Sequence, residues 1–389
     1  MGKESITFVS KRIYAGDRPF AGYIKVSDGQ IESMGTSLPD DPNTKVVDVG
    51  DSRVIPGLID LHLHGFAGNS FVSPKEGAIT NAAKALAEAG TTAFQPTSAT
   101  SPIEELDRFL QRVEGLCDGP VYGARVIGSH MEGPFLNAKR KGAMIEELIF
   151  TPDLEQMKKW MELGQGTINQ VTIAPEMPNA LEVIRYLADM GVTVSAGHTD
   201  ATFEQTEEAI RAGVNLACHT FNAMRPLNHR DPGVLGAVLT NRNVTCELIS
   251  DCMHIHQAIM RMIIDAKGYE KVCMITDASA VAGLLPGKYE AEGRAVTIDA
   301  SGLTRLPDGT IAGSTATMVK CLKNVVERVG VPIEAALQMA ALNPARIAGV
   351  EHFKGSLAVG KDADVVVIDD AYNVLWSLVE GEVIKEPKA

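Results

Sequence analysis

The 389-residue chain is 45% hydrophobic and 22% charged, which is ordinary for a globular protein and excludes a mainly disordered, collagen-like or coiled-coil chain. Its 36 Lys and Arg residues against 49 Asp and Glu give a formal net charge of −13, so neither nucleic acid nor a membrane surface is expected as a partner. The six scattered cysteines, without a Cys-x-x-Cys pair, and the lack of a signal peptide or of an apolar run of about 18 residues predict a cytoplasmic protein with reduced thiols.

Both ends of the chain are predicted to form β-strands. Residues 6–9, 22–26 and 30–34 are rich in β-forming residues, and residues 364–368, 372–376 and 383–384 show the same pattern. Neither end is long enough to bury a core of its own, so we expect the two ends to pair in one small domain. The predicted division is 1–55 with 349–389 for this small domain and 56–348 for a central domain.

The central part alternates between helical stretches and apolar runs of strand length. A helix is predicted at residues 78–89, capped by Ser73 and Pro74, and another at about 101–115. Eight buried strands that alternate with helices predict a parallel (β/α)₈ barrel. An open doubly wound sheet is the alternative, which is disfavoured because no Gly-x-Gly-x-x-Gly follows a strand. The predicted strands are residues 53–59, 92–96, 125–129, 170–174, 192–196, 215–217, 244–250 and 271–276.

Histidines and carboxylates gather at the ends of these predicted strands, where a barrel carries its chemistry. Six of the nine histidines lie there, namely His62, His64, His130, His198, His219 and His254, together with Glu132, Glu176, Asp251 and Asp277. His62 and His64 are two apart on an extended segment, so both side chains can reach one ion. Glu132, His198 and His219 can converge on an ion as well. Imidazoles with carboxylates suit Zn²⁺ or Fe²⁺ better than Mg²⁺ or Ca²⁺.

Each of these signals alone also has a plain structural interpretation. The His-x-His pair is weak by itself, Asp277 could cap a helix, and Glu132 before Gly-Pro could belong to a simple turn. Their coincidence at several strand ends favours a metal site. Such a metal lowers the pKa of a bound water molecule toward about 7, and Asp277 could either ligate the metal or accept a proton from that water.

Several blocks of sequence resemble a known family. Residues 56–65, which read Pro-Gly-Leu-Ile-Asp-Leu-His-Leu-His-Gly, are similar to the opening motif of the amidohydrolase superfamily. The blocks at 132–135 (Glu-Gly-Pro-Phe), 174–176, 197–199, 219–224 (His-Thr-Phe-Asn-Ala-Met), 251–254 and 276–278 resemble the N-acetylglucosamine-6-phosphate deacetylase family. The resemblance covers nearly the whole chain in order. It implies a (β/α)₈ barrel with a small β-sandwich built from both termini.

The resemblance also implies a role for each matching residue. Glu132, His198 and His219 would hold a metal common to the family, and His62 and His64 would add a second metal site, giving one or two ions of Zn²⁺ or Fe²⁺. Asp277 would take a proton from the attacking water, pass it to the leaving amine, and contribute to metal binding. A phosphorylated amino sugar would be bound by Asn222, Ala223, Arg230, His254, Ala143, Ile311, Ala312 and Gly313. Arg230 would reach the site of a partner subunit, so a homodimer is expected.

Two positions depart from the family pattern. Met144 stands two residues after Gly142, where the family usually has a histidine that helps to bind the substrate, and a thioether cannot donate a hydrogen bond. Either another group replaces that contact, or the substrate differs, or the enzyme is slower. Cys252 follows Asp251 where the family usually has glycine.

The sequence leaves other functions open. Deacetylation of N-acetylglucosamine 6-phosphate is the leading hypothesis, with the galactosamine epimer as the nearest alternative. A related amidohydrolase acting on another small amide is a further alternative. Hydrolysis of a cyclic amide or deamination of a heterocycle is less consistent with Glu176 at strand 4, where such enzymes often carry a carboxylated lysine. A non-catalytic relative is disfavoured by the complete set of Glu132, His198, His219 and Asp277.

Overall fold

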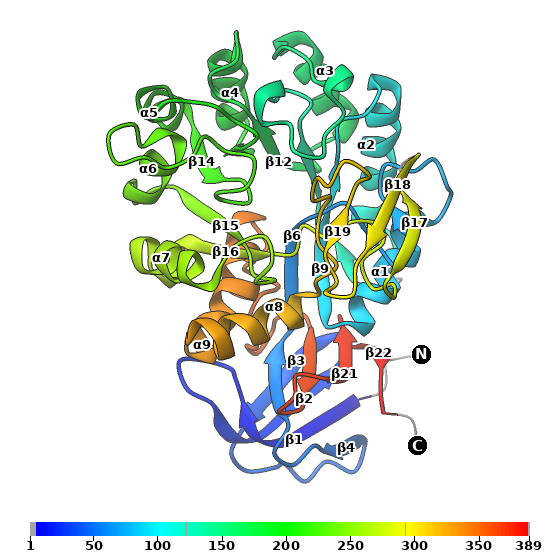
Figure 1. Cartoon of the computed structure of the whole chain (residues 1–389). Coiled ribbons are helices and arrows are strands. Elements are labelled where there is room, and N and C mark those ends of the chain that lie inside the picture. Colours follow the sequence, from blue (N-terminus) through cyan, green and yellow to red (C-terminus); the bar gives the residue numbers. More distant parts are fainter. Residues whose placement is uncertain (1–4, 121–122, 292, 388–389) are drawn as a thin grey trace.

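A computed structural model describes residues 5–120, 123–291 and 293–387. Its centre is a barrel of parallel strands (Figure 1). The barrel strands in order are β6 (Leu58–Leu63), β9 (Thr91–Ser98), β11 (Ser129–Glu132), β12 (Ile168–Ile173), β13 (Thr193–Ala196), β14 (Val214–Ala217), β15 (Thr245–Ile249) and β16 (Val272–Ile275). The barrel closes between its last and first strands, where the Asp277 amide donates to His62 O at 2.9 Å and the His64 amide to Ala278 O at 2.8 Å. The predicted (β/α)₈ architecture is therefore confirmed.

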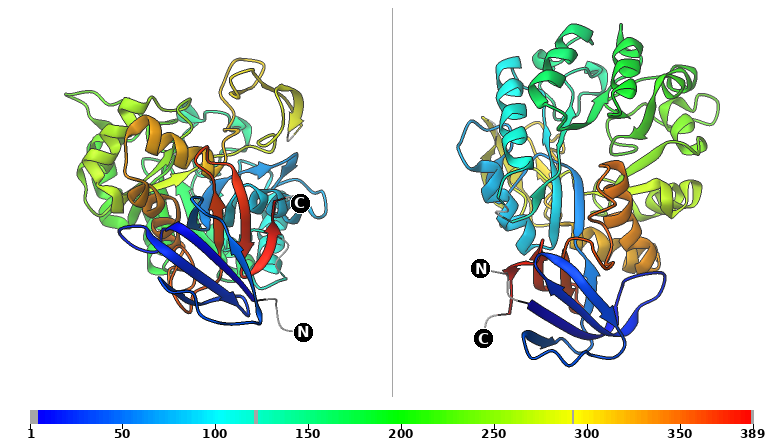
Figure 2. Two further views of the ribbon diagram at one scale, coloured as in Figure 1. Left: turned by 90° about the horizontal axis from the view of Figure 1, so that it is seen from below. Right: turned by 180° about the vertical axis from the view of Figure 1, so that it is seen from behind.

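Helices cover the outside of the barrel (Figures 1 and 2). They are α1 (Ala78–Glu88), α2 (Ile103–Cys117), α3 (Leu154–Gly164), α4 (Ala180–Asp189), α5 (Phe203–Ala212), α6 (Gly233–Thr240), α7 (Gln257–Lys267), α8 (Met318–Asn324), α9 (Ile333–Leu337) and α10 (Asn343–Ile347). Short 3₁₀ turns lie at Ala138–Arg140, Glu146–Leu148 and Tyr269–Lys271, and π-helical turns at Val325–Val329 and Gln338–Leu342. No helix in the described ranges combines the length and apolarity needed to cross a membrane.

Three local predictions are wrong. The run 53–59 is two strands, because β5 (Arg53–Pro56) pairs with the terminal segments and the barrel strand begins only at Leu58. The run 125–129 is also divided, into β10 (Arg125–Val126) and β11, by Gly128 at a φ of 122° that strands do not adopt. Helix α1 is preceded by Gly77 in a left-handed conformation, and neither Ser73 nor Pro74 caps it.

The two ends of the chain form one sheet beside the barrel (Figure 2). Its order is β22 (Glu382–Lys385), β21 (Val374–Val379), β20 (Val365–Ile368), β5, β1 (Ser5–Ile13), β2 (Phe20–Ser27) and β3 (Gln30–Gly35), and β4 (Thr44–Asp48) pairs with β1. Alternate residues such as Phe8, Ile24 and Trp376 face a separate apolar core. The expected small β-sandwich built from both termini is present.

A second sheet is inserted after the last barrel strand. It consists of β17 (Gly287–Ala291), β18 (Arg294–Ile298) and β19 (Thr304–Arg305), and Val296 and Ile298 pack with Val281 in a small apolar cluster. A short hairpin of β7 (Gly65–Phe66) and β8 (Asn69–Ser70) follows the first barrel strand. Both insertions extend the carboxyl ends of barrel strands, so they can border anything bound there.

A buried group of charges joins the barrel to the terminal sheet. Lys354 Nζ lies 3.0 Å from Asp364 and 3.1 Å from Glu380, and Arg125 at the edge of the barrel forms a two-point ion pair with Glu380 at 2.7 and 2.6 Å. Burial raises the pKa of Glu380, but its ion pairs with Arg125 and Lys354 outweigh burial and lower that pKa to about 2. These contacts therefore favour the ionised carboxylate.

We expect Glu380→Gln to destabilise the protein by roughly 2 kcal/mol at pH 7. Because the folded-state pKa is lowered, the contribution of Glu380 is complete above the ordinary value of 4.5 and is lost as the pH falls toward 2. Urea unfolding at pH 7 and at pH 3.5 should show a difference between variant and parent that shrinks in acid. The exposed Glu155, paired with Lys158 at 2.8 Å, gives a control, since Glu155→Gln should cost under about 0.5 kcal/mol. A constant or growing difference in acid would contradict this account.

Candidate active site

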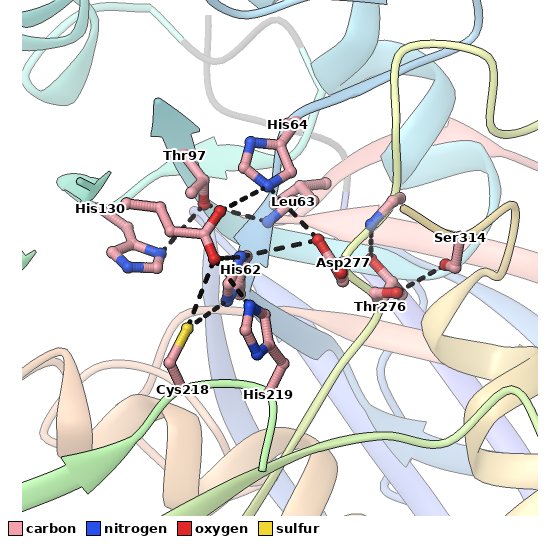
Figure 3. Close-up of polar contacts among 12 residues, drawn as sticks. His62, Leu63, His64, Thr97, His130, Cys218, His219, Thr276, Asp277 and Ser314 are labelled. Carbon is pink, nitrogen blue, oxygen red and sulfur yellow. Dashed lines mark hydrogen bonds and ion pairs between the residues drawn. The ribbon is translucent and has the colours of Figure 1, made fainter. Parts of the chain in front are cut away.

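The predicted site residues converge at the carboxyl ends of the barrel strands. A cavity of about 310 Å³ opens there. Its lining includes His64, Glu132, His198, His219 and Asp277, and His62 lies fully buried beside them. Figure 3 shows His62, His64, His219 and Asp277 pointing toward one another. The residues come from five different strands or strand ends, so only the closed barrel brings them together.

Glu132 occupies the middle of the cluster. Its Oε1 atom lies 2.8 Å from His219 Nε2, 3.1 Å from His198 Nε2 and 3.4 Å from His62 Nε2. Its Oε2 atom lies 3.1 Å from His64 Nε2. Glu132 is only 1% exposed. One buried carboxylate is thus surrounded by four imidazole nitrogens.

Among the groups of described side chains with the spacing of metal ligands, two include residues that line the cavity, and a third, His62 with His130 and Cys218, is fully buried. Glu132, His198 and His219 place one ligand atom each within 4.8 Å of one another, and so do His62, His64 and Asp277. Asp277 Oδ1 lies 3.3 Å from His64 Nε2 and 3.6 Å from His62 Nε2. These are the two groups that the sequence predicts.

The charges of the cluster compensate one another. Burial lowers the pKa of His64, but hydrogen bonds to Asp277 and Glu132 outweigh it and raise that pKa to about 9. Burial raises the pKa of Asp277, but the hydrogen bond from His64 and the charges of His62, His64 and His219 outweigh it and lower that pKa to about 2. Two buried carboxylates therefore require positive charge nearby, carried either by protons on the histidines or by a metal cation.

The donor atoms fit a divalent metal. His198 Nδ1 donates to Arg140 O at 2.8 Å, which fixes the proton on Nδ1 and leaves a lone pair on Nε2. His198 Nε2 and His219 Nε2 face each other at 3.1 Å, and buried His62 Nε2 has no hydrogen-bond partner. A cation bound among these nitrogens and the Glu132 carboxylate would take the place of protons between them and be held by their lone pairs. Nitrogen and carboxylate oxygen donors suit Zn²⁺ or Fe²⁺.

Glu247 is a site residue that the sequence reasoning missed. It lies in β15, is fully buried, and its Oε2 atom accepts from His62 Nδ1 at 3.0 Å and from the His219 amide at 2.9 Å. Its Oε1 atom accepts from Gln170 Nε2 at 2.7 Å. A glutamate in the middle of the apolar run 244–250 was the available signal, because buried carboxylates need strong partners. Glu247 thus orients one histidine of each metal-ligand group.

We expect Glu247→Gln to weaken metal binding about 10- to 100-fold, because the amide has a single acceptor oxygen and its NH₂ group would face a donor on one side, either Gln170 Nε2 or His62 Nδ1 with the His219 amide. Competition with a chromophoric chelator measures this affinity. A circular dichroism spectrum and a cooperative unfolding transition check that the variant is folded. An affinity within threefold of the parent would mean that Glu247 contributes only to packing.

Several residues at the ends of the barrel strands have a left-handed backbone conformation, with positive φ angles. The φ angles are 46° at His198, 22° at His219 and 50° at Asp277. Such conformations cost roughly 1 to 3 kcal/mol each for non-glycine residues and are typical of functional sites. Cys252, with a φ of 63°, occupies the same kind of conformation. This explains why glycine is usual at that position in the family that the sequence resembles.

Most of the predicted substrate-binding residues line the cavity, and one does not. Asn222, Ala223, His254, Ala143, Ile311, Ala312 and Gly313 all border it. Arg230 is exposed and does not border the cavity of its own chain. Met144 lies in the cavity wall, where its sulfur accepts a hydrogen bond from Thr100 Oγ1 at 3.7 Å. The side chain of Met144 therefore offers no hydrogen-bond donor of its own to a ligand.

The remaining polar residues at the strand ends support the site indirectly. Glu176 accepts hydrogen bonds from Thr199 Oγ1 and the Asp200 amide, both at 2.5 Å, and holds the segment after His198. Asp251 Oδ2 lies 2.6 Å from His254 Nδ1. His130 instead lies inside the barrel, 2.8 Å from Thr172 Oγ1. These contacts assign Glu176 and Asp251 to the support of loops that border the cavity.

Comparison with known proteins agrees with this geometry. Residues 53–385 match the model of the amidohydrolase family. The N-acetylglucosamine-6-phosphate deacetylase of Bacillus subtilis is 35% identical over 367 residues, which is 93% of this chain and 92% of the relative. The N-acetylgalactosamine-6-phosphate deacetylase of Escherichia coli O157:H7 is 34% identical over 360 residues, which is 92% of this chain and 93% of the relative.

Solved structures show the same similarity. One is a variant of the N-acetylglucosamine-6-phosphate deacetylase of Mycobacterium smegmatis in complex with N-acetyl-D-glucosamine-6-phosphate. It superposes with a TM-score of 0.91 at 32% identity, over 98% of this chain and all of that one. The Pasteurella multocida deacetylase gives a TM-score of 0.91 at 31% identity, over 97% of this chain and 99% of that one. The chain therefore belongs to the N-acetylglucosamine-6-phosphate deacetylase family of the amidohydrolase superfamily.

Proposed function

We propose that this protein hydrolyses the acetamido group of N-acetylglucosamine 6-phosphate to give glucosamine 6-phosphate and acetate, with the help of a divalent metal. The observation that carries the proposal is the cluster of Glu132 with four imidazoles and Asp277 in one cavity. The names of the relatives indicate the substrate.

Glu132, His198 and His219 would hold the first metal, and His62 and His64, together with Asp277, would complete a second site. A metal bound there supplies two effects, polarisation of the acetyl carbonyl and a lower pKa for the attacking water. Asp277 accepts the proton of that water as it attacks the carbonyl carbon. The same carboxyl group then returns the proton to the amine nitrogen as the carbon–nitrogen bond breaks. Zn²⁺ and Fe²⁺ are the metals that we propose.

The other cavity residues would position the sugar phosphate. Asn222, Ala223 and His254 border the side of the cavity next to His219, and the 311–313 segment borders the side next to Asp277, whose O atom accepts from the Ser314 amide at 2.7 Å. Arg230, exposed in its own chain, would reach the cavity of the partner subunit in a homodimer.

We also propose the domain division 1–55 with 349–389 against 56–348, because β5 ends at Pro56 and the barrel strand begins at Leu58. Gly57 between them packs so closely that a Cβ atom would lie 2.0 Å from Thr92 Oγ1. A cytoplasmic location is supported by the six cysteines, all of which are free thiols.

N-acetylgalactosamine 6-phosphate is a second candidate substrate, favoured by the similar relative of Escherichia coli O157:H7. Acetate release from both epimers, measured at equal concentrations, tests the proposal. A higher kcat/KM for the glucosamine epimer supports it, and a higher value for the galactosamine epimer would transfer the assignment to that sugar. No release from either would direct the search to other small amides.

A further inference from the structure

One wall of the cavity carries a positively charged side chain. Arg294, the first residue of β18, borders the same cavity as Glu132 and Asp277. The β17–β18–β19 sheet lies outside the barrel order, so Arg294 reaches the site from an insertion (Figure 1). Among the described residues that line this cavity, Arg294 is the one Lys or Arg.

The guanidinium of Arg294 is held against a loop of the site. Its Nη1 atom donates to Ala143 O at 2.5 Å. The preceding residue, Gly142, lies beside two other wall residues, since a Cβ atom there would be 3.4 Å from His198 Cε1 and 3.8 Å from Ala223 Cβ. Arg294 is therefore fixed to the loop that borders His198 and Ala223.

The negative charge of the protein suggests a role for this cation in binding an anionic substrate. A phosphate dianion that enters the cavity is repelled by the net charge of −13 that the protein carries. A local cation with several N–H donors offsets that repulsion, and the planar fork of arginine matches phosphate oxygens. Met144 beside Ala143 offers no donor.

We propose that Arg294 is a substrate-binding residue that contacts the phosphate of the phosphorylated amino sugar from within its own chain. The inference rests on the proposed function. If Arg294 only anchored the 142–144 loop, its loss would impair the chemical step, whether or not the substrate carries a phosphate. A residue that binds the phosphate instead contributes to substrate affinity.

The test compares Arg294→Gln with Arg305→Gln. Arg305 lies on the same small sheet, also donates to a backbone carbonyl, that of Gly309 at 2.8 Å, and does not border the cavity. We expect Arg294→Gln to raise KM for N-acetylglucosamine 6-phosphate about 10- to 100-fold with kcat within about threefold, because a charged hydrogen bond is lost. Arg305→Gln should leave both parameters unchanged. An unchanged KM, or a fall in kcat alone, would overturn the assignment.

A second measurement needs no turnover. Inorganic phosphate should raise the Tm of the metal-loaded parent and of Arg305→Gln, and should raise that of Arg294→Gln much less. An equal rise in all three proteins, or no rise in the parent, would overturn the role of Arg294. Lack of acetate release by the parent would contradict the proposed function alone, and the phosphate experiment would still decide on Arg294.

Discussion

Asp277→Asn is expected to lower kcat for deacetylation by at least about 1000-fold while the protein stays folded and keeps the metal held by Glu132, His198 and His219. An amide cannot accept the proton of the attacking water and therefore has none to return to the leaving amine. Asparagine preserves the size of the side chain and tolerates the left-handed backbone at this position, where φ is 50°. The loss should thus appear in kcat, measured by acetate release in parallel with metal analysis.

Asp265 provides the matched control for this substitution. It is an exposed carboxylate on α7, paired with Arg261 at 2.9 Å, and Asp265→Asn should retain full activity. If Asp277→Asn kept more than about a tenth of the parental kcat, another group would have to carry the proton, and the assigned role of Asp277 would be wrong.

His219→Ala is the second substitution with a large expected effect. It removes an imidazole nitrogen that lies 2.8 Å from Glu132 Oε1 and 3.1 Å from His198 Nε2. The three-residue group then has only two ligands, so the purified variant should contain less than half of the parental metal and show a kcat lower by about 1000-fold or more. Elemental analysis and acetate release measure the two quantities on the same sample.

His352 supplies the comparison, since it is the histidine remote from the site and is exposed. His352→Ala should retain both metal and activity. A His219→Ala variant with parental metal content would mean that Glu132 and His198 hold the ion with other partners, and the proposed ligand group would have to be revised.

The residues of the candidate metal site were the part of the structure that the sequence predicted best. Glu132, His198, His219, His62, His64 and Asp277 were predictable because imidazoles and carboxylates followed apolar runs at strand ends, and parallel strands place such ends on one face. The same alternation predicted the barrel. The meeting of both chain ends in one small sheet followed from the size that a stable core requires.

Other features depend on contacts between distant segments. Glu247 contacts His62 from a strand 185 residues away, and an isolated glutamate in an apolar run does not reveal its partner. Strand boundaries shifted at Gly57 and Gly128, where backbone packing or a positive φ ends one strand and starts another. Arg294 borders the cavity because it lies on an inserted sheet, and sequence periodicity alone did not predict that this sheet covers the site. These are outcomes of tertiary packing, which a local pattern does not encode.

Acetate release from N-acetylglucosamine 6-phosphate by the unsubstituted protein tests the central claim most directly, measured before chelation, after chelation and after addition of Zn²⁺ or Fe²⁺. The arrangement around Glu132 predicts rapid release, its loss on chelation, and its return with metal. Release that persists in a protein shown by elemental analysis to be free of metal, or no release from the metal-loaded and folded protein, would contradict the account.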